Sequence, residues 1–278
     1  MKVKVKILDT KIIKSFLTIM GILGGIYTYV TIFFEVPDKF KNKINIVIFV
    51  TLILGGIYLF LWLKANKLSK VSLNINGSDL DVKVGDIFEE DGFKVIAFNE
   101  YFDTQVDDII IAESTLNGIF IKKKLGVTLS EFDDYIEKEL DSLDLVLEVN
   151  ENRKMGKKKK YPLGTICKYN EYFLTALTKF DDKNKAEILL KDYVNFLMNF
   201  WNEVDRLYAG KSVAVPLLGS GQTRIKDKID ISDQELLEIL IWSFKISRIK
   251  FNYPAKVSII IHSSKKDKIN FFKLKELV

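Results

Sequence analysis

The chain has 278 residues, of which 48% are hydrophobic and 28% are charged. This composition excludes an intrinsically disordered or fibrous protein, and the length allows one large domain or two. Residues 1–70 hold 11 Lys and three acidic residues, whereas residues 71–278 hold 31 basic and 34 acidic residues. Because the larger part is slightly acidic, we predict that the protein has no nucleic-acid partner.

Two apolar segments, residues 15–34 and 44–63, are each 20 residues long and contain no Asp, Glu, Lys, Arg or His. A helix of this length is about 30 Å long, which matches the hydrocarbon thickness of a bilayer. The nine-residue connection contains Pro37, so we predict an antiparallel transmembrane hairpin within residues 1–70. A signal peptide and two buried core helices are the alternatives, but the first run is long for a signal peptide and neither run has a polar stripe.

Lysines flank the two segments unevenly. Five precede the first segment, three lie in the connection, and three follow the second segment before residue 71. Positive charge favours the cytoplasmic side of a membrane, so eight lysines against three place both termini in the cytoplasm. We therefore predict a multi-pass protein whose domain of residues 71–278 is cytoplasmic.

Both segments contain the hexapeptide Ile-Leu-Gly-Gly-Ile-Tyr, at residues 22–27 and 53–58. Glycine in a membrane helix allows another backbone to approach closely. Two interpretations are open: the glycine pairs pack the hairpin together, or they form contacts between hairpins in a homo-oligomer. The segments lack charged residues, which argues against an ion-coupled transporter or a voltage sensor.

Beyond residue 70 the pattern is typical of an α/β domain, a central mixed sheet flanked by helices. Helices are predicted for residues 131–142, for a long amphipathic segment between Asn184 and Tyr208, and for residues 236–249, which follow a capping box of Ser232 and Glu235. Strands are predicted at residues 71–75, 80–84, 93–98, 109–112, 143–149, 164–168, 172–176, 212–215 and 257–261.

Two local features are suited to binding a nucleotide. One is the turn Gly85-Asp86-Ile87, which follows a strand, and the other is residues 213–223, where a buried strand runs into the sequence Gly219-Ser220-Gly221. Backbone N–H groups in such a glycine loop are unobstructed by side chains and can bind a diphosphate. A glycine loop after a strand is also an ordinary turn in many proteins.

Together these features, over residues 72–265, resemble the macro domain family, whose members bind ADP-ribose. The resemblance implies that Asp86 and Ile87 contact the adenine, that Asn99 lies beside a ribose, and that Asp103 and Thr104 meet the distal part of the ligand. It implies that the diphosphate and adjoining ribose are bound by Leu218, Gly219, Ser220, Gly221, Gln222 and Thr223.

The chain departs from the hydrolytic macro domains, in which an N-A-A-N-like strand end precedes a glycine-rich loop. Here residues 98–103 contain no glycine. We therefore expect binding rather than catalysis. A membrane-anchored ADP-ribosyl hydrolase using Asn99 and Asp103 is one alternative, and a passive anchor for ADP-ribosylated proteins is another.

A macro-like domain behind two membrane spans resembles the ThsA effector family of type II Thoeris anti-phage defence. The resemblance implies that a partner TIR-domain enzyme converts NAD into a histidine–ADP-ribose signal, which the macro-like domain senses. It further implies a homo-oligomer that disrupts or perforates the lipid bilayer of the bacterial inner membrane. We expect no resident cofactor and no metal ion.

Three remaining features are weighed as structural. His262 is the only histidine and Cys167 the only cysteine, so the sequence contains few of the residues that a metal site or a catalytic triad requires. The basic run at residues 153–160 is interpreted as a solvated loop, with contact to anionic lipid headgroups as the alternative.

Overall fold

The computed structural model describes residues 3–34, 43–181, 184–221, 224–225 and 231–277. The chain forms two compact units. One, the hairpin unit, consists of Met1–Ser69 with Asn270–Lys273. The other, the head, consists of Lys70–Ile269 with Leu274–Val278. The segment Asn270–Lys273, close to the end of the chain, therefore belongs to the hairpin unit.

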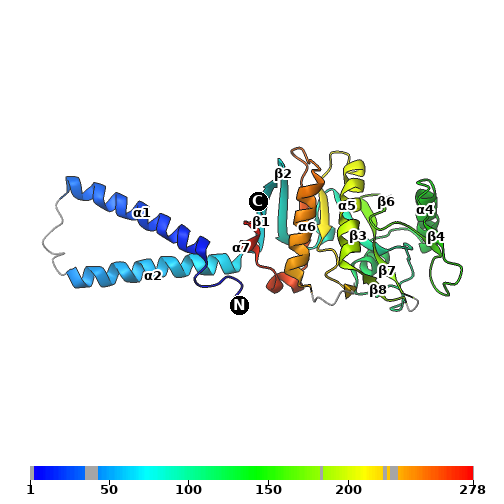
Figure 1. Cartoon of the computed structure of the whole chain (residues 1–278), viewed down its shortest axis with the longest axis horizontal. Helices are drawn as coiled ribbons and strands as arrows, with labels where there is room; N and C mark the ends of the chain where they lie inside the picture. The colour runs from blue at the N-terminus through cyan, green and yellow to red at the C-terminus, as the bar shows by residue number, and fades with distance from the viewer. Residues whose placement is uncertain (1–2, 35–42, 182–183, 222–223, 226–230, 278) are drawn as a thin grey trace. The chain divides into compact units, whose positions relative to one another are not determined.

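The hairpin unit contains helix α1 (Thr10–Phe33) and helix α2 (Lys43–Lys67). Both predicted helices are confirmed, and both are long and apolar enough to cross a membrane. They contact each other near the beginning of α1, where the Phe16 ring meets the Tyr58 ring edge-on at 5.3 Å. Toward the C-terminal end of α1 the two helices separate (Figure 1).

The glycine pairs Gly24-Gly25 and Gly55-Gly56 are not used to pack α1 against α2. Among the described residues, a methyl group placed on any of the four glycines would meet no atom within 4 Å other than the neighbouring backbone of its own helix. The structure therefore does not support packing within the hairpin as the reason for the repeated hexapeptide. Contact between hairpins of different copies is the interpretation that we carry forward.

Asn66 fixes the N-terminal segment beside α2. Its buried side-chain oxygen accepts hydrogen bonds from the backbone N–H groups of Lys4, at 2.7 Å, and Val5, at 3.0 Å. Its side-chain nitrogen donates to the Trp62 carbonyl at 2.9 Å. On the other side, the Asn270 side chain donates to the Lys4 carbonyl at 2.9 Å. Asn270 thus joins the N-terminal segment and α2 within the hairpin unit.

The head is built on a nine-stranded mixed sheet in the order β1-β2-β11-β9-β3-β7-β8-β10, with β6 also pairing with β7. The five consecutive strands β2, β11, β9, β3 and β7 are parallel. Strand β1 pairs antiparallel with β2, β6 and β8 pair antiparallel with β7, and β10 pairs parallel with β8. The strands are β1 (Lys70–Ile75), β2 (Ser78–Val84), β3 (Phe93–Asn99), β6 (Ile166–Tyr169), β7 (Tyr172–Phe180), β8 (Ala186–Ile188), β9 (Val213–Pro216), β10 (Arg224–Ile225) and β11 (Val257–Ile261).

Helices flank this sheet, as predicted. The α-helices of the head are α3 (Leu116–Lys123), α4 (Leu129–Asp141), α5 (Leu190–Leu207) and α6 (Asp233–Ser247), and its short 3₁₀ helices are η2 (Ile87–Glu89) and η3 (Ser263–Lys268). The short helix α7 (Phe271–Leu274) lies mostly in the segment that belongs to the hairpin unit. Phe120 of α3 and Phe132 of α4 bury alternate side chains of β3, including Ile96 and Phe98. Helices α5 and α6 lie in front of the sheet in Figure 1 and pack together, with the Trp201 indole donating to the Ser243 hydroxyl at 2.9 Å.

Most predicted elements are confirmed, including the capping box of Ser232 and Glu235 before α6. The predicted strand at residues 109–112 is wrong, because the Asp107 carboxylate accepts the backbone N–H groups of Ile109 and Ile110 and so removes donors that a ladder needs. Of the strand predicted at residues 143–149, only β4 (Glu148–Val149) forms, paired with β5 (Lys159–Lys160). The strand β8 occupies part of the segment predicted to open the long helix, and α4 begins after Thr128.

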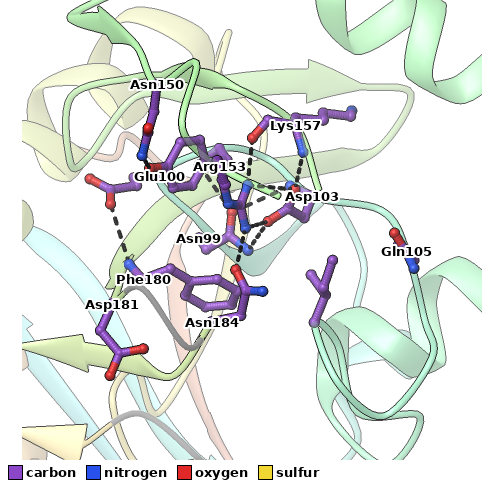
Figure 2. Close-up of polar contacts among 12 residues, drawn as sticks. Asn99, Glu100, Asp103, Gln105, Asn150, Arg153, Lys157, Phe180, Asp181 and Asn184 are labelled. Carbon is purple, nitrogen blue, oxygen red and sulfur yellow. Dashed lines mark hydrogen bonds and ion pairs between the residues drawn. The ribbon is translucent and has the colours of Figure 1, made fainter. Parts of the chain in front are cut away.

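A buried ion pair holds the loop after β4 onto the head (Figure 2). Asp103 is 1% exposed, and its two carboxylate oxygens face the two terminal nitrogens of Arg153 at 3.0 and 2.7 Å. The carboxylate also accepts the Lys157 backbone N–H at 2.7 Å and the Asn99 side-chain amide at 2.9 Å. The guanidinium lies 3.8 Å from the centre of the Tyr101 ring. Every lone-pair direction of this buried carboxylate is thus matched by a donor.

The basic run at residues 153–160 is largely neutralised within the head. Arg153 is buried against Asp103, and the four consecutive lysines each face a carboxylate. The pairs are Lys157 with Asp133, Lys158 with Glu151, Lys159 with Glu137 and Asp141, and Lys160 with Glu148. This arrangement favours the interpretation as a solvated loop over contact with anionic lipid.

Replacing Asn66 by Ala removes the acceptor for two backbone donors. Leaving a donor without its partner costs about 1–3 kcal/mol, so we expect amide exchange in the peptide containing Lys4 and Val5 to accelerate roughly ten- to a hundredfold. Hydrogen–deuterium exchange of the full chain in detergent measures this. Asn74→Ala, which removes an exposed side-chain contact with Asp79, is the control. Unchanged exchange at the N-terminus would show that Asn66 does not hold this segment.

Replacing Arg153 by Met leaves the Asp103 carboxylate buried without its partner. Breaking a buried pair on one side costs about 3–5 kcal/mol, so the thermal midpoint of the head should fall by roughly 6–20 °C. Lys158→Met breaks an exposed pair with Glu151 and is the matched control, with a shift of at most a few degrees expected. Equal midpoints for the two variants would contradict a structural role for the ion pair.

Candidate ligand-binding site

The ends of the five parallel strands create one cavity. Because these strands run in the same direction, their carboxyl ends lie along one edge of the sheet, where ligands of open α/β sheets bind. The residues at and after these ends line a cavity of about 490 Å³, a size typical of small-molecule sites. They are residues 85–87 after β2, Asn99 at the end of β3, Leu177, Thr178 and Phe180 of β7, residues 217–221 after β9, and His262 after β11.

Asp86 places a carboxylate at one side of the cavity. It caps η2, and its Oδ1 atom accepts the Phe88 backbone N–H at 3.0 Å, which fixes the direction of the side chain. The neighbouring Ile87 is buried against Ala214 and Ile260. An exposed carboxylate beside this apolar floor is able to accept hydrogen bonds from the amino group of a bound heterocycle.

The loop of residues 217–221 is held in one conformation by hydrogen bonds to its carbonyl groups. The Leu217 carbonyl accepts the Ser220 hydroxyl at 2.7 Å, the Leu218 carbonyl accepts the Tyr193 hydroxyl at 2.9 Å, and the Ser220 carbonyl accepts the Lys265 ammonium at 2.6 Å. Within this loop the residue between Leu218 and Ser220 is Gly219, with φ of +80°. Glycine adopts this left-handed backbone without strain.

The beginning of α3 forms another wall of the cavity. Residues 114–117 line it, and the Thr115 hydroxyl caps the helix by accepting the Gly118 N–H at 3.2 Å. A methyl group on Gly118 would come within 2.3 Å of the Ala112 carbonyl oxygen, so only glycine fits there. The N-terminal end of a helix carries a partial positive charge, which attracts anionic groups.

Asn99 lines the cavity, but its side-chain amide is hydrogen-bonded to other groups of the protein. Its oxygen accepts the backbone N–H groups of Tyr101 and Asp103, and its nitrogen donates to the Asp103 carboxylate. Asp103 and Thr104 are not among the lining residues, and the Thr104 hydroxyl donates to Asp133 at 2.6 Å. Contact of Asp103 and Thr104 with a ligand stays a prediction, and their observed partners lie within the protein.

The buried Glu100 and the half-buried Asn184 support this end of the cavity (Figure 2). The Glu100 carboxylate accepts the backbone N–H of Phe180, a lining residue, at 3.3 Å. Burial raises the pKa of the Glu100 carboxyl group. The Asn184 side-chain oxygen accepts from Arg153 at 3.0 Å. The wall formed by Asn99 and Phe180 is therefore backed by a fixed polar network.

The structure brings together seven of the eleven residues predicted for the site. Asp103 and Thr104 lie outside the lining, and Gln222 and Thr223 lie outside the described residues. The seven that share the cavity are Asp86, Ile87, Asn99, Leu218, Gly219, Ser220 and Gly221.

Sequence reasoning missed several lining residues, including His262, Ser264 and Lys265. His262, predicted to be structural, has an exposed ring at the cavity and lies 2.8 Å from the Ser264 hydroxyl through Nδ1. The sequence contained a signal for His262 as a site residue, because it directly follows the predicted strand at residues 257–261 and ligands bind at the carboxyl ends of such strands. Cys167, in contrast, is buried, and burial raises the pKa of its thiol to about 12, which agrees with the prediction of an inert cysteine.

Comparisons with known proteins agree with this geometry. A family model described as Thoeris protein ThsA, Macro domain, matches residues 80–262. The Thoeris protein ThsA of Bacillus amyloliquefaciens (strain Y2) is 47% identical over 214 residues, which cover 75% of this chain and 71% of that protein.

Two solved structures of the Oceanobacillus iheyensis macrodomain are more distantly similar. A mutant with ADPR aligns at 16% identity with a TM-score of 0.49, over 75% of this chain and 98% of that one. The macrodomain with MES bound aligns at 16% identity with a TM-score of 0.48, over 75% and 97% of the two chains.

The family model spans most of the head, and the Bacillus relative matches three quarters of the chain at nearly half identity. The protein therefore belongs to the Thoeris ThsA family, and its head is the Macro domain of that family.

Proposed function

We propose that the protein is a ligand-gated membrane effector of anti-phage defence. The head binds an ADP-ribose conjugate, of the histidine–ADP-ribose type, that a partner TIR-domain enzyme makes from NAD. Binding favours assembly of several copies, and the assembled hairpins disrupt the bilayer. The observation that carries the proposal is one cavity that combines the Asp86 carboxylate with the loop of residues 217–221, in a chain that also has two apolar helices.

The chemistry of the cavity suits the parts of ADP-ribose. The Asp86 carboxylate accepts the amino group of adenine, beside the apolar surface of Ile87. The diphosphate lies between the loop of residues 217–221 and the N-terminal end of α3, both of which offer backbone N–H groups. The distal ribose and its conjugated group lie toward Asn99 and Phe180.

The two apolar helices anchor the protein in the bacterial inner membrane. The excess of lysines outside the connecting segment supports a cytoplasmic location for both termini and the head, where NAD-derived signals arise. The lipid bilayer is thus both the environment and the target of the hairpin.

Disruption of the membrane requires several copies, because two helices do not enclose a pore. In a single hairpin the four glycines of the repeated hexapeptide leave open space around their Cα atoms, so they are free to receive a helix of a second copy. A ligand shifts a closed population to an open one only through its preference for the assembled state, by about 5.5 kcal/mol for a change from 1:99 to 99:1. When several heads of one assembly bind the ligand, each contributes part of this free energy.

The geometry favours a sensor over a hydrolase. Asn99 uses both atoms of its amide within the protein, and the Asp103 carboxylate is buried and held by Arg153. A general base needs a lone pair within reach of the attacking water, and Asp103 is not among the residues that line the cavity.

The central test is dye release from liposomes that contain the full chain. We expect histidine–ADP-ribose to trigger leakage and adenosine to have little effect. Asp86→Ala should raise the ligand concentration for half-maximal leakage roughly ten- to a hundredfold, because a charge-assisted hydrogen bond contributes about 1.5–3 kcal/mol. Asp91→Ala, an exposed site outside the lining, is the control. Leakage indifferent to the ligand would reject gating, and hydrolysis of the conjugate found by product analysis would favour the enzyme alternative.

The glycine pairs give a second test. Gly25→Leu and Gly56→Leu should leave ligand binding unchanged and reduce leakage at saturating ligand at least tenfold, because the larger side chain keeps neighbouring helices apart. Val50→Leu adds bulk at a lipid-exposed position of α2 and serves as the control. Full leakage from both glycine variants would exclude the pairs as contacts between copies.

A further inference from the structure

We propose that Tyr193 and Lys265 are positioning residues that orient the backbone of the loop at residues 217–221 toward the diphosphate. The inference rests on the proposed function, since it concerns how the same cavity binds an ADP-ribose-type ligand. Neither residue was singled out by the sequence. Each donates a hydrogen bond to a carbonyl group of the loop, at 2.9 Å for Tyr193 and 2.6 Å for Lys265.

The direction of a carbonyl fixes the direction of the next N–H. In a trans peptide the two groups lie in one plane and point opposite ways. The Leu218 carbonyl points into the interior, toward the fully buried Tyr193 hydroxyl, so the N–H of Gly219 points away from the interior. By the same reasoning, the Ser220 carbonyl directed at Lys265 sets the direction of the Gly221 N–H.

Tyr193 acts from beneath the loop. Its side chain is fully buried in α5, and a methyl group on Gly219 would lie 3.4 Å from its ring. Burial raises the pKa of the phenol, so the hydroxyl remains a donor at physiological pH. Because the ring is shielded from the cavity by the loop, Tyr193 affects a ligand only through the backbone that it holds.

Lys265 acts from the rim. It lies in η3 and lines the cavity, and besides the Ser220 carbonyl its ammonium group contacts the Asp233 carboxylate of α6 at 3.2 Å. Asp233 also faces Lys268 at 3.4 Å. The ammonium group therefore holds the Ser220 carbonyl in one direction, and it adds positive charge beside the loop.

The test compares two tyrosines of similar chemistry in the full chain in detergent. Tyr193→Phe should weaken ADP-ribose binding about tenfold in calorimetry, the effect of one hydrogen bond. Adenosine lacks the diphosphate, so its affinity, measured by competition, should stay within about twofold of that of the unmodified protein. Tyr208→Phe removes the same kind of bond, from Tyr208 to the Lys250 carbonyl at 3.0 Å, and should change neither affinity.

Lys265 is tested by a pair of variants. Lys265→Met should weaken ADP-ribose binding at least tenfold, because a charge-assisted bond is about twice as strong as a neutral one. Lys265→Arg keeps a charged donor and should restore most of the affinity. Thermal midpoints of the unliganded variants, close to that of Tyr208→Phe, would show that the loss is not one of folding.

The outcomes separate the two levels of inference. If the unmodified protein does not bind ADP-ribose or its histidine conjugate, the proposed function fails. Suppose instead that the unmodified protein binds. If Tyr193→Phe then has the same affinity for ADP-ribose, or if its affinities for adenosine and for ADP-ribose fall by the same factor, the positioning role of Tyr193 is overturned while the proposed function stands. Equal weakening by Lys265→Met and Lys265→Arg would overturn the role of Lys265.

Discussion

Parallel pairing of β2, β11, β9, β3 and β7 is the constraint on which the cavity depends. Five strands that run in one direction must end at one edge, and each is followed there by backbone that leaves the sheet. This alone gathers segments as distant in sequence as residues 85–87 and 217–221. The glycine at position 219 and the cap at Thr115 then set the conformation of the loop and of the helix start that line this edge.

At this edge, some polar groups are hydrogen-bonded within the protein and others line the cavity. Around Asn99, Asp103 and Arg153 the donors and acceptors satisfy one another, so this part of the head provides rigidity. Asp86 and the glycine loop of residues 217–221 line the cavity instead. This division fits the proposed role of a sensor that binds its ligand without changing it chemically, since reactive groups held in internal contacts are not available to transfer protons to a ligand.

Periodicity and caps predicted most of the sheet and the helices α4, α5 and α6, because apolar alternation and the Ser232–Glu235 box act locally. The failures are also local in origin: the Asp107 side chain captures backbone donors at residues 109–110, and β8 is too short to leave a pattern. The Asp86 and glycine-loop residues were found through motifs. The roles of Tyr193 and Lys265 were not predictable, because their carbonyl partners are set by tertiary packing.

The segment Asn270–Lys273 returns to the hairpin unit after the sheet is complete. Phe272 packs with Val5, Ile12 and Ala65, whereas the residues from Leu274 onward belong to the head. A fragment of the head that starts at Lys70 would leave the Phe272 side chain without these apolar neighbours, which adds apolar surface to the fragment. Production of a well-behaved isolated sensor therefore calls for a polar replacement of Phe272 rather than for trimming of the C-terminus.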